Sequence, residues 1–152
     1  MKKQRVALAS LVLALAVTIV GAPIAVLADS HGKPGLFVNL TTDDTWAATK
    51  AVMFAHKKAL KAGHKPVAIW LNVRGIYLAD RNRASHSHGL MTQSVHDMLQ
   101  AFVKDGGRVI ACQACAKAAG LTEDDFIDGV EMGNPDLVFG LLFDPKIKSL
   151  SW

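Results

Sequence analysis

The hydrophobic pattern along the chain predicts strands that alternate with helices. Residues 35–42 (GLFVNLTT) are typical of a first strand, and the nearly continuous apolar run over residues 65–73 (KPVAIWLNV) is typical of a second. Residues 108–111 predict a third strand, and residues 147–152 could form a last one. Strands this uniformly apolar belong in sheets that are covered on both faces.

Helical patterns separate these strands. Residues 45–61 are rich in alanine and are followed by Gly63, which suits a helix and its C-terminal end. Residues 92–104 have an apolar stripe of helical period, formed by Val95, Met98, Leu99, Phe102 and Val103. A third helix is expected over residues 112–119. Shorter helices should open at Thr122 and at Pro135.

The alternation predicts an α/β fold, a three-layer α/β/α sandwich with a mainly parallel sheet of about five strands. Residues 29–152 should form one domain, because no repeat or linker divides them. Residues 74–91 are expected to be an irregular, mobile loop, since they end in the polar stretch RNRASHSHG.

Residues 1–28 have the pattern of a cleavable secretory signal. A basic start is followed by the uncharged apolar run of residues 6–20 and by small residues up to Ala28. The run is shorter than the roughly 20 residues that a spanning helix needs. We therefore expect a periplasmic protein with no stable membrane anchor.

The charge of the chain changes once this signal is set aside. Lys2, Lys3 and Arg5 account for three of its 17 basic residues, which leaves 14 against 13 acidic residues. A mature chain so close to neutrality gives no support for a nucleic-acid partner.

Candidate chemistry gathers where the predicted strands end. In an open parallel sheet the functional crevice lies at the carboxyl ends of the strands. Thr41 lies at the carboxyl end of the first strand, Asn72 and Arg74 lie at the end of the second, and the segment Cys112-Gln113-Ala114-Cys115 follows the third. A cation at Arg74 would stabilise a thiolate and an anionic sulfur species beside it; alternatively, Arg74 is a surface arginine with no role in the site.

The two cysteines are separated by only two residues, so a disulfide between them would close a very small loop and stabilise little. At a strand-to-helix junction Cys112 should be the more reactive sulfur, and Cys115, one turn later, could resolve a mixed disulfide or persulfide on it. The other interpretations are an inert buried pair and a thioredoxin-like redox protein, although the usual aromatic and proline neighbours of a thioredoxin site are missing. Covalent c-type haem is excluded, because Ala116 stands where that motif needs histidine.

Three segments carry a resemblance to a known family. Residues 106–130 (GGRVIACQACAKAAGLTEDDFIDGV) resemble the DsrE/DsrF-like sulfur-relay family, which includes the TusD and YchN types. Residues 35–44 and 63–80 are similar to the same family. The resemblance covers nearly all of residues 29–152.

The resemblance implies a small α/β domain that forms homotrimers or homohexamers and carries sulfur as a persulfide. Cys112 would be the carrier and Cys115 the second cysteine of the YchN-like branch, with sulfur donors and acceptors as partners and no cofactor. From their positions at the carboxyl ends of the strands, Thr41, Asn72, Arg74 and Gln113 are the expected substrate-binding residues. Two features depart from the family: Ala119 replaces a common arginine, and the export signal is absent from the familiar cytoplasmic members.

Two alternatives stay open. His86 and His88 could bind a metal with a third ligand, or could lie in a solvated loop. The chain could also be a non-catalytic module whose cleft, with loop 81–91, holds a small ligand while the cysteines are passive. In a redox-active pair, we expect the closed disulfide to accept no sulfane sulfur, because that step needs a thiolate.

Overall fold

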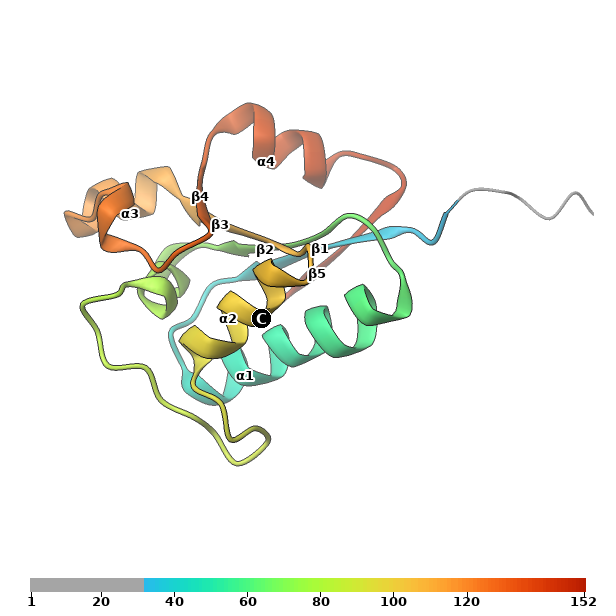
Figure 1. Cartoon of the computed structure of the whole chain (residues 1–152). Coiled ribbons are helices and arrows are strands. Elements are labelled where there is room, and N and C mark those ends of the chain that lie inside the picture. Colours follow the sequence, from blue (N-terminus) through green and yellow to red (C-terminus); the bar gives the residue numbers. More distant parts are fainter. Residues whose placement is uncertain (1–31) are drawn as a thin grey trace, which may run out of the picture. The chain divides into compact units, whose positions relative to one another are not determined.

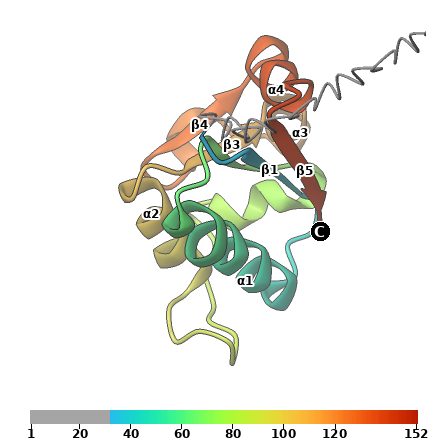
Figure 2. The same cartoon turned by 90° about the vertical axis from the view of Figure 1, so that its right-hand side faces the viewer.

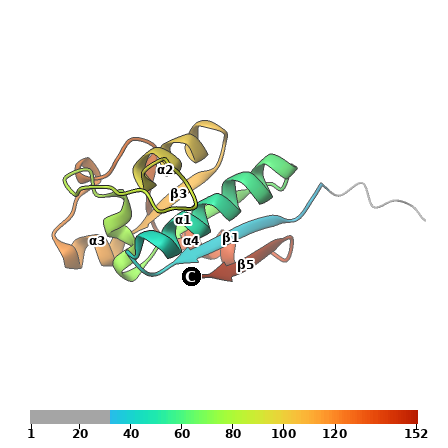
Figure 3. The same ribbon diagram turned by 90° about the horizontal axis from the view of Figure 1, so that it is seen from below.

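The computed structural model describes residues 32–152, and the predicted secretory signal lies outside the described residues. Five strands form one sheet with the order β4-β3-β2-β1-β5, and every neighbouring pair is parallel. The strands are β1 (Gly35–Leu40), β2 (Val67–Leu71), β3 (Arg108–Cys112), β4 (Val130–Gly133) and β5 (Ile147–Ser151). Figure 3 shows β5 beside β1 at one edge of the sheet.

Helices cover both faces of the sheet, which confirms the predicted three-layer α/β/α sandwich. Along β1, Val38 and Leu40 belong to the larger buried cluster, and Phe37, just before Val38, belongs to a smaller one. The larger cluster lies under α1 (Thr45–Met53) and α2 (Val95–Lys104), and the smaller one lies under α4 (Pro135–Leu142). Figures 1 and 2 show α4 on the side of the sheet opposite α1 and α2.

The two long helices begin where the sequence provides caps. Asp44 accepts a hydrogen bond from the Ala47 N–H at 2.8 Å, and Ser94 forms a capping box with Asp97. The predicted helix over residues 45–61 is continuous but changes its winding: α1 passes into the π-helix η1 (Phe54–Ala59) and the 3₁₀-helix η2 (Leu60–Ala62). It ends at Gly63, whose φ is 87°.

The prediction of an irregular loop over residues 74–91 is wrong for its first part. Residues Val73–Ala79 form the 3₁₀-helix η3, and Ile76, Leu78 and Ala79 are buried in the larger cluster. Gly75 has a packing role, because a Cβ at this position would overlap the carbonyl oxygen of Leu40. The loop therefore begins only after Ala79.

The last third of the chain also holds a strand that the pattern did not predict. β4 lies between the 3₁₀-helix η4 (Glu123–Asp125) and α4, and it pairs with β3 through a register that sets Cys112 opposite Gly133. The helix α3 (Gln113–Ala119) follows β3 directly and ends at Gly120. Within residues 32–152, no helix is long and apolar enough to cross a membrane.

Candidate functional site

The candidate residues lie at one edge of the sheet, where three parallel strands end. β1 ends at Leu40 just before Thr41, β2 ends at Leu71 just before Asn72, and β3 ends at Cys112 itself. The strands are neighbours in the order β3-β2-β1, so their carboxyl ends lie side by side. The sequence places polar and sulfur-bearing side chains at each of these ends.

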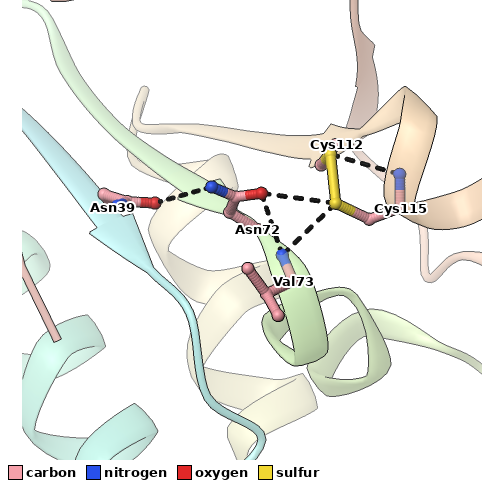
Figure 4. Close-up of a disulfide and its surroundings, with 5 residues drawn as sticks. All are labelled: Asn39, Asn72, Val73, Cys112 and Cys115. Atoms are coloured by element: carbon pink, nitrogen blue, oxygen red, sulfur yellow. Dashed lines mark hydrogen bonds between the residues drawn. A yellow bond between two sulfur atoms is a disulfide. The ribbon is translucent and has the colours of Figure 1, made fainter.

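Cys112 and Cys115 form a disulfide at this edge (Figure 4). Cys112 is both the last residue of β3 and the N-cap of α3, and its Sγ accepts a hydrogen bond from the Cys115 N–H at 3.2 Å. Only 8% of Cys112 is exposed, whereas Cys115 is half-buried. The turn from strand to helix thus brings the two sulfurs together without any help from distant segments.

The loop after β2 surrounds the sulfur of Cys115. The Val73 N–H donates to Cys115 Sγ at 3.3 Å and to Asn72 Oδ1 at 2.9 Å, and Asn72 Oδ1 itself lies 3.3 Å from this Sγ (Figure 4). On its other side the Asn72 amide donates to Asn39 Oδ1 at 3.3 Å. Cys115 therefore has one N–H donor and one carbonyl acceptor within reach of its sulfur.

Val73 has an unusual backbone. Its φ is 51°, in the left-handed region, which is a genuine outlier for a β-branched residue. Strained backbone of this kind persists where the surroundings hold it in place, and it clusters at functional sites. Here the conformation directs the Val73 N–H at the sulfur of Cys115.

Arg74 forms a bidentate ion pair with Asp43. Its Nε and Nη2 donate to the two carboxylate oxygens at 2.9 and 2.6 Å. Hydrogen bonding by Arg74 lowers the pKa of Asp43 below its ordinary value of 3.8. Arg74 lines the same hollow as Cys115, but its charge is already matched by this carboxylate and 64% of its side chain is exposed.

Thr41 and Gln113 occupy different surroundings. The Thr41 hydroxyl donates to the carbonyl oxygen of Trp152 at 2.7 Å, which ties the end of β1 to the end of the chain. Gln113 is exposed and lies beside Cys112. The structure thus brings Asn72 to Cys115 and Gln113 to Cys112, while the hydroxyl of Thr41 is engaged elsewhere.

Two hollows meet the disulfide from different sides. The Cys112 hollow has a volume of about 220 Å³, and the Cys115 hollow has a volume of about 370 Å³. Cys112 lines only the first and Cys115 only the second. The other residues of the Cys112 hollow are Trp70, Gln113, Ala114, Gly133, Asn134, Pro135, Val138 and Phe139. Those of the Cys115 hollow are Val73, Arg74, Ile76, Tyr77, Ala118 and Ala119.

The residues after β4 that line one side of the Cys112 hollow were not predicted from the sequence. Asn134 and Phe139 reach the site because β4 pairs with β3 and ends beside Cys112. The motif Asn134-Pro135 does predict a helix start, but nothing local places that start at the same edge as the cysteines. Val73 was also missed, because a β-branched residue gives no signal of a positive φ.

The histidines of the loop after η3 lie away from the cysteines. The His88 ring stacks on Trp46 with 4.6 Å between ring centroids, and His86 is exposed. Burial lowers the pKa of His96, which lines a small hollow with His86. Among residues 32–152, no three His, Cys, Asp or Glu side chains lie close enough to hold a metal ion.

Comparison with known proteins identifies relatives of this chain and of its fold. The profile of the DsrE/DsrF-like family matches residues 35–138. An uncharacterised protein of Methanopyrus kandleri, MK0008, is 47% identical over 36 residues, which are 24% of this chain and 30% of that protein. The chain thus matches less than a third of the length of this relative.

Solved structures share the fold at low sequence identity. The YchN protein of E. coli has a TM-score of 0.62 at 16% identity, over 78% of this chain and 99% of that one. Protein MTH1491 of Methanobacterium thermoautotrophicum has a TM-score of 0.58 at 16% identity, over 78% and 99% of the two chains. Protein BT1422 of Bacteroides thetaiotaomicron has a TM-score of 0.59 at 17% identity, over 78% and 95%. These likenesses concern the fold alone.

Proposed function

Because this chain belongs to the DsrE/DsrF-like family, we propose that it is a sulfur-relay protein that carries sulfane sulfur as a persulfide on Cys112. The observation that supports this proposal most directly is the position of Cys112 at the carboxyl end of β3, within bonding distance of a second cysteine. Cys115 is the resolving thiol. The donor and the acceptor are other proteins or small sulfur species.

The proposed chemistry uses the two cysteines in turn. In the reduced pair, the Cys112 thiolate attacks the outer sulfur of a donor persulfide or polysulfide, and the rest of the donor leaves with the electrons of the broken S–S bond. Cys112 then carries one additional sulfur. When no acceptor takes this sulfur, the Cys115 thiolate attacks Cys112 Sγ, expels the outer sulfur as hydrosulfide and closes the disulfide that the structure contains.

Intact mass spectrometry tests this proposal on the reduced protein. After incubation with polysulfide the parent should gain one sulfur atom, and Cys112→Ser should gain none. Cys115→Ser should gain the sulfur and hold it longer than the parent, because the resolving nucleophile is gone. Equal gain by Cys112→Ser, or equally fast loss from Cys115→Ser, would contradict the roles given to the two cysteines.

A thiol–disulfide redox protein is the second candidate, and the closed Cys112–Cys115 pair is the observation that favours it. Such a protein exchanges electrons with a partner dithiol and never gains a sulfur atom. The same mass measurement separates the two functions. A pair that cycles between disulfide and dithiol with every donor, without gain of sulfur, would belong to the redox candidate.

The site of action and the assembly are part of the proposal. We place the protein in the periplasm, on the basis of the export pattern in residues 1–28. A homotrimer or homohexamer is supported by two neighbouring aromatic rings on the outside of the domain, Phe139 and Phe143, which are 54% and 74% exposed. Exposed apolar patches of this kind are typical of interaction surfaces. Light scattering of the parent and of Phe143→Ser measures the assembly.

A further inference from the structure

In the closed disulfide the two sulfurs have different surroundings, and the carrier function does not require this difference. Cys112 lines one hollow, Cys115 lines the other, and each sulfur has a different set of neighbours. A nucleophile that attacks a disulfide forms a bond to one sulfur and expels the other, so these two environments decide which sulfur is attacked and which one leaves.

Cys115 has the surroundings of a leaving group. The Val73 N–H, 3.3 Å from Cys115 Sγ, can hydrogen-bond to a developing thiolate. After proton uptake, the new S–H can donate to Asn72 Oδ1, which is also 3.3 Å away. The strained φ of Val73 and the bond from Asn72 to Asn39 hold both partners in place before the S–S bond breaks.

Cys112 has the surroundings of the attacked sulfur. It is 8% exposed, so only a small nucleophile can reach Sγ, and the approach is through the Cys112 hollow. Among the described residues this hollow is lined by apolar side chains, such as Trp70 and Phe139, and by the uncharged Gln113 and Asn134. Such a lining disfavours a dianion such as thiosulfate, because no cation replaces its lost hydration.

Hydrogen sulfide fits these conditions. It is neutral or singly charged and only slightly larger than water, whose share of liquid volume is about 30 Å³, against a hollow of about 220 Å³. We infer that the closed form of this protein takes up hydrogen sulfide directly at Cys112, with Cys115 as the leaving group. The inference rests on the proposed function in one respect, namely that Cys112 is the cysteine that holds the cargo.

The step balances without any further reagent. The sulfur of hydrogen sulfide forms a bond to Cys112 Sγ while the Cys112–Cys115 bond breaks and its electron pair stays on Cys115. One proton of hydrogen sulfide remains on the new perthiol, and the other moves to Cys115. The disulfide is reduced by two electrons, and the incoming sulfide is oxidised to sulfane sulfur. The closed pair thus accepts sulfide, whereas the open pair accepts sulfur that is already sulfane.

The test uses the whole chain with its disulfide closed. Sodium sulfide is added without oxygen, the reaction is quenched with a thiol-blocking reagent, and intact mass with peptide mapping locates the products. The inference predicts one additional sulfur on Cys112 and a blocking group on Cys115. Sodium thiosulfate should add no sulfur to the closed form. Simple reduction of both cysteines without an additional sulfur, or an additional sulfur on Cys115, would overturn the inference.

Two alanines of α3 provide matched variants for the direction of attack. Ala114 lines the Cys112 hollow and Ala118 lines the Cys115 hollow, and both are exposed. Ala114→Phe should slow loading from sulfide by about tenfold, with Ala114→Leu intermediate, whereas Ala118→Phe should stay within about twofold of the parent. The reverse order would place the attack at Cys115 and refute the inference. The reduced parent should still gain sulfur from polysulfide; a parent that passes this control but takes no sulfide when closed keeps the proposed function and loses only the inference.

Discussion

Val73 provides a direct test of the strain at the site. Its φ of 51° is a conformation that glycine adopts freely and that an L-residue avoids because Cβ crowds the neighbouring carbonyl oxygen. Val73 is 57% exposed, so replacing its side chain disturbs little of the core. The informative comparison is Val73→Gly with Val73→Ala, because both variants lose the branched side chain and only alanine keeps the Cβ.

The expected difference in the free energy of unfolding between Val73→Gly and Val73→Ala follows from two opposed effects. A Cβ in the left-handed region costs about 1–2 kcal/mol. Glycine gains additional freedom in the unfolded chain, which normally makes it less stable than alanine by about 0.5–1 kcal/mol. The difference predicts that Val73→Gly is more stable than Val73→Ala by about 0.5–1 kcal/mol, the reverse of the usual order.

Urea and thermal unfolding with the disulfide closed measure this difference. A free-energy difference of this size corresponds to roughly 2–5 °C in Tm for a domain of this length. Ala118→Gly on the exposed face of α3 is the control, and it should lose about 1 kcal/mol because its backbone is helical. If Val73→Ala is as stable as Val73→Gly or more stable, the backbone at this position is not strained.

Two further predictions concern residues outside the cysteine pair. Hydrogen bonds from Lys61 and His56 lower the pKa of Asp105 from 3.8 to about 2. The ionised carboxylate therefore stabilises the fold fully at pH values above 3.8, and this stabilisation is lost as the pH falls through about 2. Asp105→Asn should remove that part of the acid dependence in urea titrations, and an unchanged profile would contradict the assignment. Gly75→Ala should destabilise the domain by about 1–3 kcal/mol, because its Cβ would overlap the end of β1. Gly89→Ala, in open space, should be nearly neutral in the same unfolding assay.

The sequence was most informative where a strand is buried on both faces. β1, β2 and β3 are largely apolar runs with glycine or polar boundaries, so their existence and order along the chain could be predicted. β4 could not be predicted in this way, because Val130–Gly133 is a short edge strand in which three of four residues are half-buried. Its strand character comes from pairing with β3, and the ion pair between Arg108 and Glu131 across that pair is invisible in a local pattern.

The structure of the segment after β2 also depends on distant parts of the chain and not on its local pattern. The segment Val73–Ala79 is too short to define a period. It folds as 3₁₀ turns because Ile76 and Leu78 pack into the core that distant segments provide. Asn72 could be assigned to the site, since it follows a strand whose carboxyl end must lie at the functional edge. The contribution of Val73 could not be predicted, because it is made by a backbone N–H and by a φ that its side chain disfavours.

The surroundings of Cys115 connect the proposed function with the loading of the closed form. Resolution of a persulfide by Cys115 and uptake of sulfide by the disulfide are the same reaction in opposite directions, so both pass through one transition state, in which charge is shared between Cys115 and the outer sulfur. The Val73 N–H stabilises that state in either direction. Cys115→Ser must therefore have opposite effects in two assays: it prolongs the life of sulfur loaded onto the reduced protein, and it abolishes uptake of sulfide, because no disulfide can form. Loss of sulfur from reduced Cys115→Ser as fast as from the parent would show instead that a group other than Cys115 resolves the persulfide.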